Sequence, residues 1–551
     1  MFLVFFDKNT RPLRSGRDYA PNLTAFPLDE SLFLCYIRTI CLKPRAAGRS
    51  NRLSCRTGGR PRNLIFSGED LMTMYEPVIG IEAHVQIRTK SKMFCSCPNT
   101  YGAPPNTDTC PVCMGMPGVL PVVNKEAVRK AVVAGMMCGC EIAKFSKFDR
   151  KSYFYPDLVK DYQITQYDLP ICKNGRIHIF GTGFSGEQLP DKWIGMTRMH
   201  LEEDPGKSTH FSNCTGLDFN RSGVPLIEIV SEPDMRSADE AYAYLSSLKE
   251  IMQYADVSDC DMEKGQMRFD VNISLRPRGT EKFGTKVEIK NLNSFRAAHR
   301  AILYEIKRQL VELENGQEIE QDTRGWNDEL GETVVQRTKE NANDYRYFPE
   351  PDLLPIVFTD AELDVFRAAL PELPADKRQR YVRDYGLTPY DAQVLTSDRS
   401  YAEFFEAAAK GSSASKIIAN LFTSELLRKL GESGGTLADC KVKPADLAAL
   451  AGLVNASTIN SKTAKKVFEE MFETGKDPDS IVKEKGLVQV SDEGAILALV
   501  DQVIAANPAQ VQQFKEGKTA VLQYLVGQLM KLSRGKANPK LAIQMFQEKL
   551  K

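Results

Sequence analysis

The amino-acid sequence predicts an α+β protein in which a mainly antiparallel sheet is followed by helices. Two runs in the first half, 78–87 and 267–275, alternate apolar and polar residues with the period of a half-buried strand. A third run, 224–231, is apolar and strand-like, with one acid in its middle. Helical patterns dominate the C-terminal third. A chain of 551 residues is too long for a single core, so we expect about three domains.

The three predicted strands share an unusual feature, since each carries an acid on one face. In the first strand Glu82 and His84 lie on the same face, roughly 6.6 Å apart. Glu228 interrupts the second strand, where burying a carboxylate is costly unless a cation or donor lies against it. Asp270 lies on the polar face of the third strand.

An outer sheet face solvated by charges is the ordinary interpretation of any one of these strands. Its repetition in three distant segments, one of them with a histidine beside the acid, favours a shared metal site instead. A hard divalent cation such as Mg²⁺ takes oxygen ligands and keeps several waters, so a few carboxylates suffice. Whether the strands meet is not evident from the sequence.

Four cysteines form a second candidate site. Cys95 and Cys97 are followed, twelve residues later, by Cys110 and Cys113. Thiolates on two such turns can close a tetrahedron around Zn²⁺, and four protein ligands leave no open position, so the zinc would be structural. Four free buried cysteines are the alternative. The odd total of thirteen cysteines indicates a reducing compartment rather than a disulfide framework.

Residues 145–157 interleave basic and aromatic side chains, and 161–167 continue the polar-aromatic character. Such a mixture can bind phosphate and stack bases. It is equally typical of a packed aromatic loop whose lysines lie along it.

Helix signals follow the acid-bearing strands. Ser237 and Glu240 have the spacing of a capping box, and the apolar stripe behind them predicts a helix that covers the sheet. Residues 286–290 begin as a strand, which leads to a helix from near Ser294 to about Gly316. Another helix is predicted from Ser461 onward.

Charge gives no global indication of a nucleic-acid partner, because Lys+Arg and Asp+Glu both total 72. Local patches must carry that argument. From residue 515 to the end, seven Lys and one Arg stand against two Glu, a net charge of 8 − 2 = +6. No apolar run approaches the 18 or so residues of a membrane span, so we expect no membrane association.

Residues 1–73 differ from the rest of the chain. Eight basic and no acidic residues lie between Arg38 and Arg62, as in a transit peptide, although four acids precede them. Translation from Met72 or Met74 is a second interpretation. We expect this extension to be disordered and without a role in the chemistry.

Seven motifs, in order, closely resemble those of the B subunit of the tRNA-dependent amidotransferases, the GatB family. They are residues 80–86, the four-cysteine segment, 147–151, 200–204, 220–233, 287–294 and 344–352. The resemblance covers roughly residues 75–551, with Ala83 where a larger aliphatic residue is expected. Residues 1–73 have no counterpart in it.

This resemblance implies a glutamine-synthetase-like cradle with a zinc knuckle over residues 74–366. A helical domain over 367–480 and a tRNA-binding, YqeY-like helical tail over 481–551 would follow. The implied activity is amidation of Glu-tRNA(Gln), and of Asp-tRNA(Asn), after ATP phosphorylates the side-chain carboxyl of the tRNA-borne amino acid. The implied partners are an amidase (glutaminase) subunit, which supplies ammonia from glutamine, and a third, small subunit. Such an enzyme is cytoplasmic, or organellar if residues 1–73 are a transit peptide.

The resemblance also assigns roles to individual residues. It implies Mg²⁺ binding by Glu82, His84, Glu202, Glu203, Glu228, Glu263 and Asp270. Of these, Glu82, His84, Glu203 and Glu228 are the expected catalytic residues. Arg221 and Lys290 are expected to contact phosphate or substrate. The expected tRNA contacts are Lys515, Lys518, Lys531, Arg534 and Lys536.

Two other functions fit parts of the sequence. One is a zinc-bearing RNA-binding module without chemistry of its own, in which carboxylate substitutions would leave activity intact. The other is a metal-dependent phosphotransferase or ligase that acts on a small free carboxylic acid and does not need tRNA.

Overall fold

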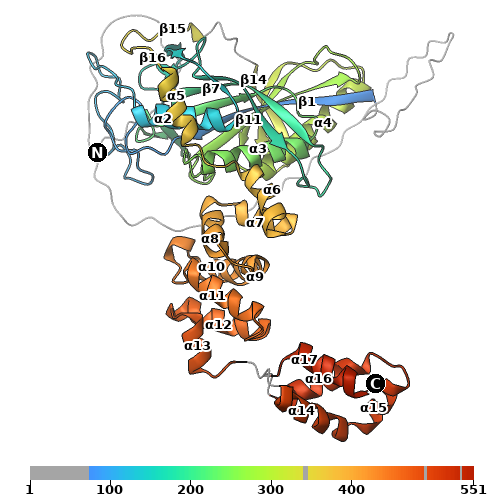
Figure 1. Cartoon of the computed structure of the whole chain (residues 1–551). Coiled ribbons are helices and arrows are strands. Elements are labelled where there is room, and N and C mark those ends of the chain that lie inside the picture. The colour runs from blue at the N-terminus through green and yellow to red at the C-terminus, as the bar shows by residue number, and fades with distance from the viewer. Residues whose placement is uncertain (1–73, 339–344, 489–492, 534–536, 551) are drawn as a thin grey trace, which may run out of the picture.

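The computed structural model describes residues 74–338, 345–488, 493–533 and 537–550, so the N-terminal extension lies outside the described residues. A sheet-containing region comes first. Helices then continue away from it as a stack, and the last four helices form a separate group (Figure 1).

Nine strands form one sheet, in the order β14-β13-β12-β11-β1-β10-β7-β6-β2. All neighbouring strands are antiparallel except β12 and β13, which confirms the predicted mainly antiparallel sheet. The strands are β1 (Tyr75–Gln86), β2 (Glu141–Ile142), β6 (Cys172–Ile179), β7 (Lys192–Glu203), β10 (Pro225–Ser231), β11 (Met267–Pro277), β12 (Val287–Leu292), β13 (Asp322–Asn327) and β14 (Glu332–Thr338).

Helices cover one face of this sheet. They are α2 (Lys125–Met137), α3 (Ala238–Tyr254) and α4 (Phe295–Glu314), and α3 and α4 lie along the sheet in Figure 1. The apolar side of β1 faces them, with Ile79, Ala83 and Val85 fully buried. Ala83 therefore belongs to a tightly packed layer between sheet and helices.

A small three-stranded sheet packs on the region from the other side. It consists of β5 (Tyr162–Thr165), β4 (Asp149–Ser152) and β15 (Phe348–Pro349), and β5 contacts β7. Two further strand pairs are β3 (Phe145–Ser146) with β16 (Ile356–Val357), and β8 (Lys207–His210) with β9 (Thr215–Asp218).

The start of α3 corrects one detail of the sequence prediction. Ser237 does cap the helix, because its side chain accepts a hydrogen bond from the Glu240 amide. The Glu240 carboxylate does not return to the Ser237 amide. It accepts instead from the Arg236 amide and from the Lys192 ammonium, both within 2.9 Å. The charge on Lys192 thus replaces half of the capping box.

The C-terminal region is helical, as predicted. Its first helices are α5 (Asp360–Ala368), α6 (Pro374–Tyr385), α7 (Pro389–Thr396), α8 (Arg399–Ala409), α9 (Ser415–Leu421), a π-helical turn (Phe422–Leu426), α10 (Leu427–Ser433), a 3₁₀ turn (Leu437–Asp439), α11 (Pro444–Asn455), α12 (Ser461–Thr474) and α13 (Pro478–Glu484). Several of them begin with proline, whose missing amide hydrogen costs nothing in the first turn.

The tail comprises α14 (Glu493–Ala506), α15 (Pro508–Lys515), α16 (Val521–Leu532) and α17 (Pro539–Leu550). It has its own core, centred on Ile496, Leu525 and Phe546, whereas one continuous set of buried side chains extends from the sheet to α13. Among the described helices, none is both long enough and apolar enough to cross a membrane.

Candidate functional site

The polar face of the sheet carries a row of side chains across three central strands. In the register of the sheet, His84 on β1 faces Glu228 on β10, and Glu228 faces His200 on β7. Paired residues in an antiparallel sheet project to the same side, so the three side chains are neighbours. Glu202 lies two residues beyond His200 on β7 and therefore on the same face.

His84, Glu202 and Glu228 form a group that could hold a metal ion, which we call the carboxylate site. Each offers one ligand atom, and these atoms all lie within 4.8 Å of one another. His84 Nε2 lies 3.4 Å from a Glu228 oxygen, and His200 Nε2 lies 3.2 Å from a Glu202 oxygen. Two nearly buried carboxylates with one imidazole are a donor set that suits a divalent cation.

The carboxylates stay charged although they are buried. Burial by itself would raise the pKa of Glu228, but His200, His84 and Lys151 outweigh it and hold that pKa well below its ordinary value. For Glu202, burial and the neighbouring Glu228 act upward, and the attraction of Lys151 and His200 leaves the pKa lowered.

Lys151 on β4 is the cation that balances them. Burial lowers its pKa, yet the charges of Glu202 and Glu228 more than compensate, so the net shift is upward. Lys151 was not among the predicted site residues. The available signal was its place in the basic and aromatic run 145–157.

Strand β5 fixes the orientation of Glu202. Thr165 Oγ1 donates a hydrogen bond of 2.7 Å to one carboxylate oxygen, and Gln163 Nε2 donates one of 3.0 Å to the other. Tyr153 Oη donates in turn to Gln163 Oε1 at 3.1 Å. These bonds restrict the rotation of a side chain that already has little space.

Glu82 and Asp270 lie beside the carboxylate site without belonging to its convergent group. They face each other across β1 and β11, on the same side of the sheet as His84. Glu82 accepts a hydrogen bond of 2.8 Å from Asn272. Asp270 pairs with the Lys290 ammonium at 2.7 Å, and Lys290 also contacts Glu288.

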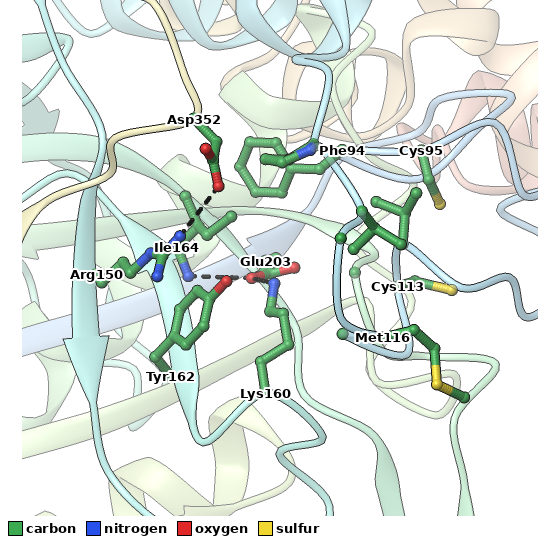
Figure 2. Close-up of a pocket in the computed structure, with 16 residues that line it drawn as sticks. Phe94, Cys95, Cys113, Met116, Arg150, Lys160, Tyr162, Ile164, Glu203 and Asp352 are labelled. Carbon is green, nitrogen blue, oxygen red and sulfur yellow. Dashed lines mark hydrogen bonds and ion pairs between the residues drawn. The ribbon is translucent and has the colours of Figure 1, made fainter.

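Glu203 is not part of the carboxylate site. It directly follows Glu202, so strand alternation turns it elsewhere. Its carboxylate accepts from the Ile164 amide at 3.0 Å and is ion-paired with Lys160. Figure 2 shows Glu203, Lys160 and Tyr162 pointing toward one another in a pocket of about 210 Å³ beside the cysteine-bearing loop.

Glu263 and Arg221 also lie away from the carboxylate site. Glu263 is exposed in a turn, and both residues line a cleft of about 810 Å³. Arg221 donates to the carbonyl oxygens of Pro205 and Gly206, at 3.1 and 2.6 Å, and so holds a turn.

The four predicted cysteines come together. Their Sγ atoms lie within 4.8 Å of one another, with 4.0 Å between Cys97 and Cys113 and 3.9 Å between Cys110 and Cys113. Thiolates around a tetrahedral zinc are about 3.8 Å apart, so this cluster could hold such an ion. In Figure 2 the sulfur atoms of Cys95 and Cys113 are turned away from Glu203 and Lys160.

Comparison with known families agrees with this geometry. The sequence model described as the GatB/GatE catalytic domain matches residues 77–364, and the one described as the GatB domain matches residues 403–550. The chain belongs to the GatB/GatE family.

Curated relatives of this GatB/GatE chain are named as the B subunit of aspartyl/glutamyl-tRNA(Asn/Gln) amidotransferase. The protein from Carboxydothermus hydrogenoformans is 52% identical over 484 residues, which are 87% of this chain and 99% of the relative. Those from Caldicellulosiruptor bescii and Persephonella marina are each 52% identical, over 86% and 87% of this chain and 99% and 100% of theirs.

In the GatB tail, the structure places only some of the predicted tRNA contacts. Lys515, Lys518 and Lys531 are exposed on or beside α15 and α16. Arg534 and Lys536 lie outside the described residues.

Proposed function

We propose that this chain is the GatB component of a tRNA-dependent amidotransferase and that its carboxylate site activates the side-chain carboxyl of Glu-tRNA(Gln) and Asp-tRNA(Asn). ATP phosphorylates that carboxyl, and ammonia then displaces the phosphate to give the amide. The order follows from chemistry, because a carboxylate oxygen is a poor leaving group until it is phosphorylated. The observation that carries this proposal is the convergence of His84, Glu202 and Glu228 next to Lys151.

In this proposal His84, Glu202 and Glu228 hold Mg²⁺, with Glu82 and Asp270 alongside. When bound, the ion neutralises negative charge on the transferred phosphoryl group. The chain's own residues prepare the site. Thr165 and Gln163 orient Glu202, as their hydrogen bonds to both of its oxygens indicate. Lys151 supplies a fixed positive charge beside the carboxylates, and Lys290 places a second ammonium next to Asp270.

Partner subunits and zinc belong to the same proposal. Ammonia comes from an amidase subunit bound together with a third, small subunit, since the sequence shows neither a serine amidase signature nor an evident Cys-His glutaminase. Zn²⁺ on the four cysteines stabilises the loop they bracket. The chain divides into domains at about residues 366 and 480, and its tail contacts tRNA.

The decisive experiment reconstitutes the chain with the amidase and the small subunit and supplies Mg²⁺, ATP and either glutamine or ammonium. Glu-tRNA(Gln) and Asp-tRNA(Asn) are offered separately, and Gln-tRNA or Asn-tRNA is the expected product. ATP turnover with free glutamate and no tRNA would favour a ligase for a small acid instead. Activity that survives substitution of Glu228 would favour an RNA-binding module without chemistry.

A further inference from the structure

Five tyrosines form a continuous row beside the carboxylate site, in the order Tyr155, Tyr153, Tyr345, Tyr347 and Tyr167. Successive ring centroids are 6.0, 5.9, 6.0 and 4.0 Å apart. The last two rings are stacked almost in parallel, at 9°. Segments far apart in the sequence thus build one aromatic surface, which we call the tyrosine row.

The middle of the row touches the site. Lys151 Nζ lies 5.0 Å from the centroid of Tyr345 and 5.8 Å from that of Tyr153. Tyr153 also reaches Glu202 through Gln163, by the two hydrogen bonds described above. Burial raises the pKa of Tyr347 to about 12, with Lys151 acting against that shift and Glu202 and Glu228 adding to it.

The two ends of the row reach the surface. Tyr155 is 47% exposed and Tyr167 is 51% exposed, and Phe154 beside them is 76% exposed. The exposed Arg346 lies between two members of the row and has a left-handed backbone, with φ of 45°. A non-glycine residue pays strain energy for that conformation, and here it accompanies two tyrosines that stand in one row.

We infer that the tyrosine row binds the unpaired 3′-terminal nucleotides of the aminoacylated tRNA by stacking on their bases. This inference rests on the proposed function, in which the amino acid attached to that 3′ end must reach the carboxylate site. Bases stack on aromatic rings whatever their sequence, and nearby cations attract the backbone. A row that runs from the site to the surface suits a strand of several bases, whereas ATP has only one.

The test uses the complete complex with the amidase and the small subunit, and a tRNA(Gln) whose 3′-terminal adenine is replaced by 2-aminopurine. Stacking quenches the fluorescence of this base. Quenching is expected with the wild type, and Tyr167→Ala and Tyr155→Ala should lose much of it. Each variant should raise KM for Glu-tRNA(Gln) about tenfold, with KM for ATP unchanged. Tyr167→Phe, which keeps the ring, should restore the wild-type KM.

Trp193→Ala is the matched control. Trp193 is 50% exposed on β7 and contacts Arg176 and His178 outside the row, so its removal should leave both readouts unchanged. A rise in KM for ATP rather than for tRNA would overturn the inference, because the row would then hold the adenine of ATP. Unchanged quenching and KM in both tyrosine variants would overturn it too.

The two proposals can fail separately. If the wild-type complex quenches 2-aminopurine through the row but forms no amide, the proposed function is wrong and base stacking stands. If it forms amide while the tyrosine variants behave like the wild type, only the stacking is wrong.

Discussion

Glu228 keeps its charge in the interior of an apolar strand because His84, His200 and Lys151 surround it. The sequence indicated that such a carboxylate needs a partner, and the first partner, His84, was among the predicted residues. Lys151 was not, because a lysine within a basic and aromatic run carries no mark that separates a buried side chain from an exposed one. Glu203 and Glu263 show the converse. Both were predicted ligands, but neither points into the site.

Glu228→Gln should abolish amide formation while tRNA binding persists. The substitution keeps the shape of the side chain and removes the charge expected to hold Mg²⁺, so we expect a loss of about a hundredfold or more in rate. Glu263→Gln, in the exposed turn, is the control and should retain activity. Product formation and filter binding of tRNA measure the two properties, and full activity of Glu228→Gln would contradict the assignment.

Lys151→Met should make the fold more sensitive to acid. Without the ammonium, Glu202 and Glu228 repel each other, and their pKa values rise. A carboxyl with a depressed folded-state pKa stabilises the fold above its unfolded pKa of about 4.3, and this contribution disappears as pH falls through the folded value.

The variant should therefore lose that stability at a pH about one unit higher than the wild type, as measured by thermal unfolding across roughly pH 3–7. Lys264→Met removes an exposed lysine elsewhere and should leave the acid transition in place. Superimposable curves for Lys151→Met and the wild type would show that Lys151 does not support the carboxylates.

Strands β1, β10 and β11 lie close to the predicted ends, because alternation of side chains is a local property that the sequence displays directly. Their order in the sheet is not local. That β1 lies between β10 and β11 depends on contacts between residues far apart in the sequence. The half-formed capping box of α3 had the same origin, since Lys192 on β7 competes for Glu240. The tyrosine row, too, combines segments that no local pattern connects.

Substitution of the four-cysteine cluster should release its metal. Cys113→Ser removes one of four thiolates, so bound zinc should fall from about one per chain to nearly none. The melting temperature should fall by about 2–4 °C for each kcal/mol that the metal contributes. Cys440→Ser, away from the cluster, is the control. Elemental analysis and calorimetry measure both effects, and a metal-free wild type with the same melting temperature would contradict a structural zinc.

The tail has a core separate from the one that extends from the sheet to α13. The basic composition of this segment was visible in the sequence, while the division of the chain at residues 366 and 480 stays a prediction. Composition alone does not distinguish lysines that contact RNA from lysines that are merely solvated, because both are exposed.

Replacing Lys515, Lys518 and Lys531 together by alanine should weaken tRNA binding and its dependence on salt. If each lysine contacts one phosphate, the slope of log K against log salt should fall by roughly 2–3. Lys549→Ala is the control, since Lys549 is ion-paired with Asp501 at 2.6 Å within the tail. Binding measured at several salt concentrations gives the slope, and an unchanged slope would contradict contact by these three residues.

The row of His84, Glu228 and His200 depends on the pairing of β1 with β10 and of β10 with β7. One residue inserted into β1 before His84, without a compensating bulge, would exchange the two sides of everything after it and turn the imidazole toward α3 and α4. Surrounding loops can lengthen or shorten freely, but the count of residues within these strands is constrained as strictly as the identity of the ligands themselves.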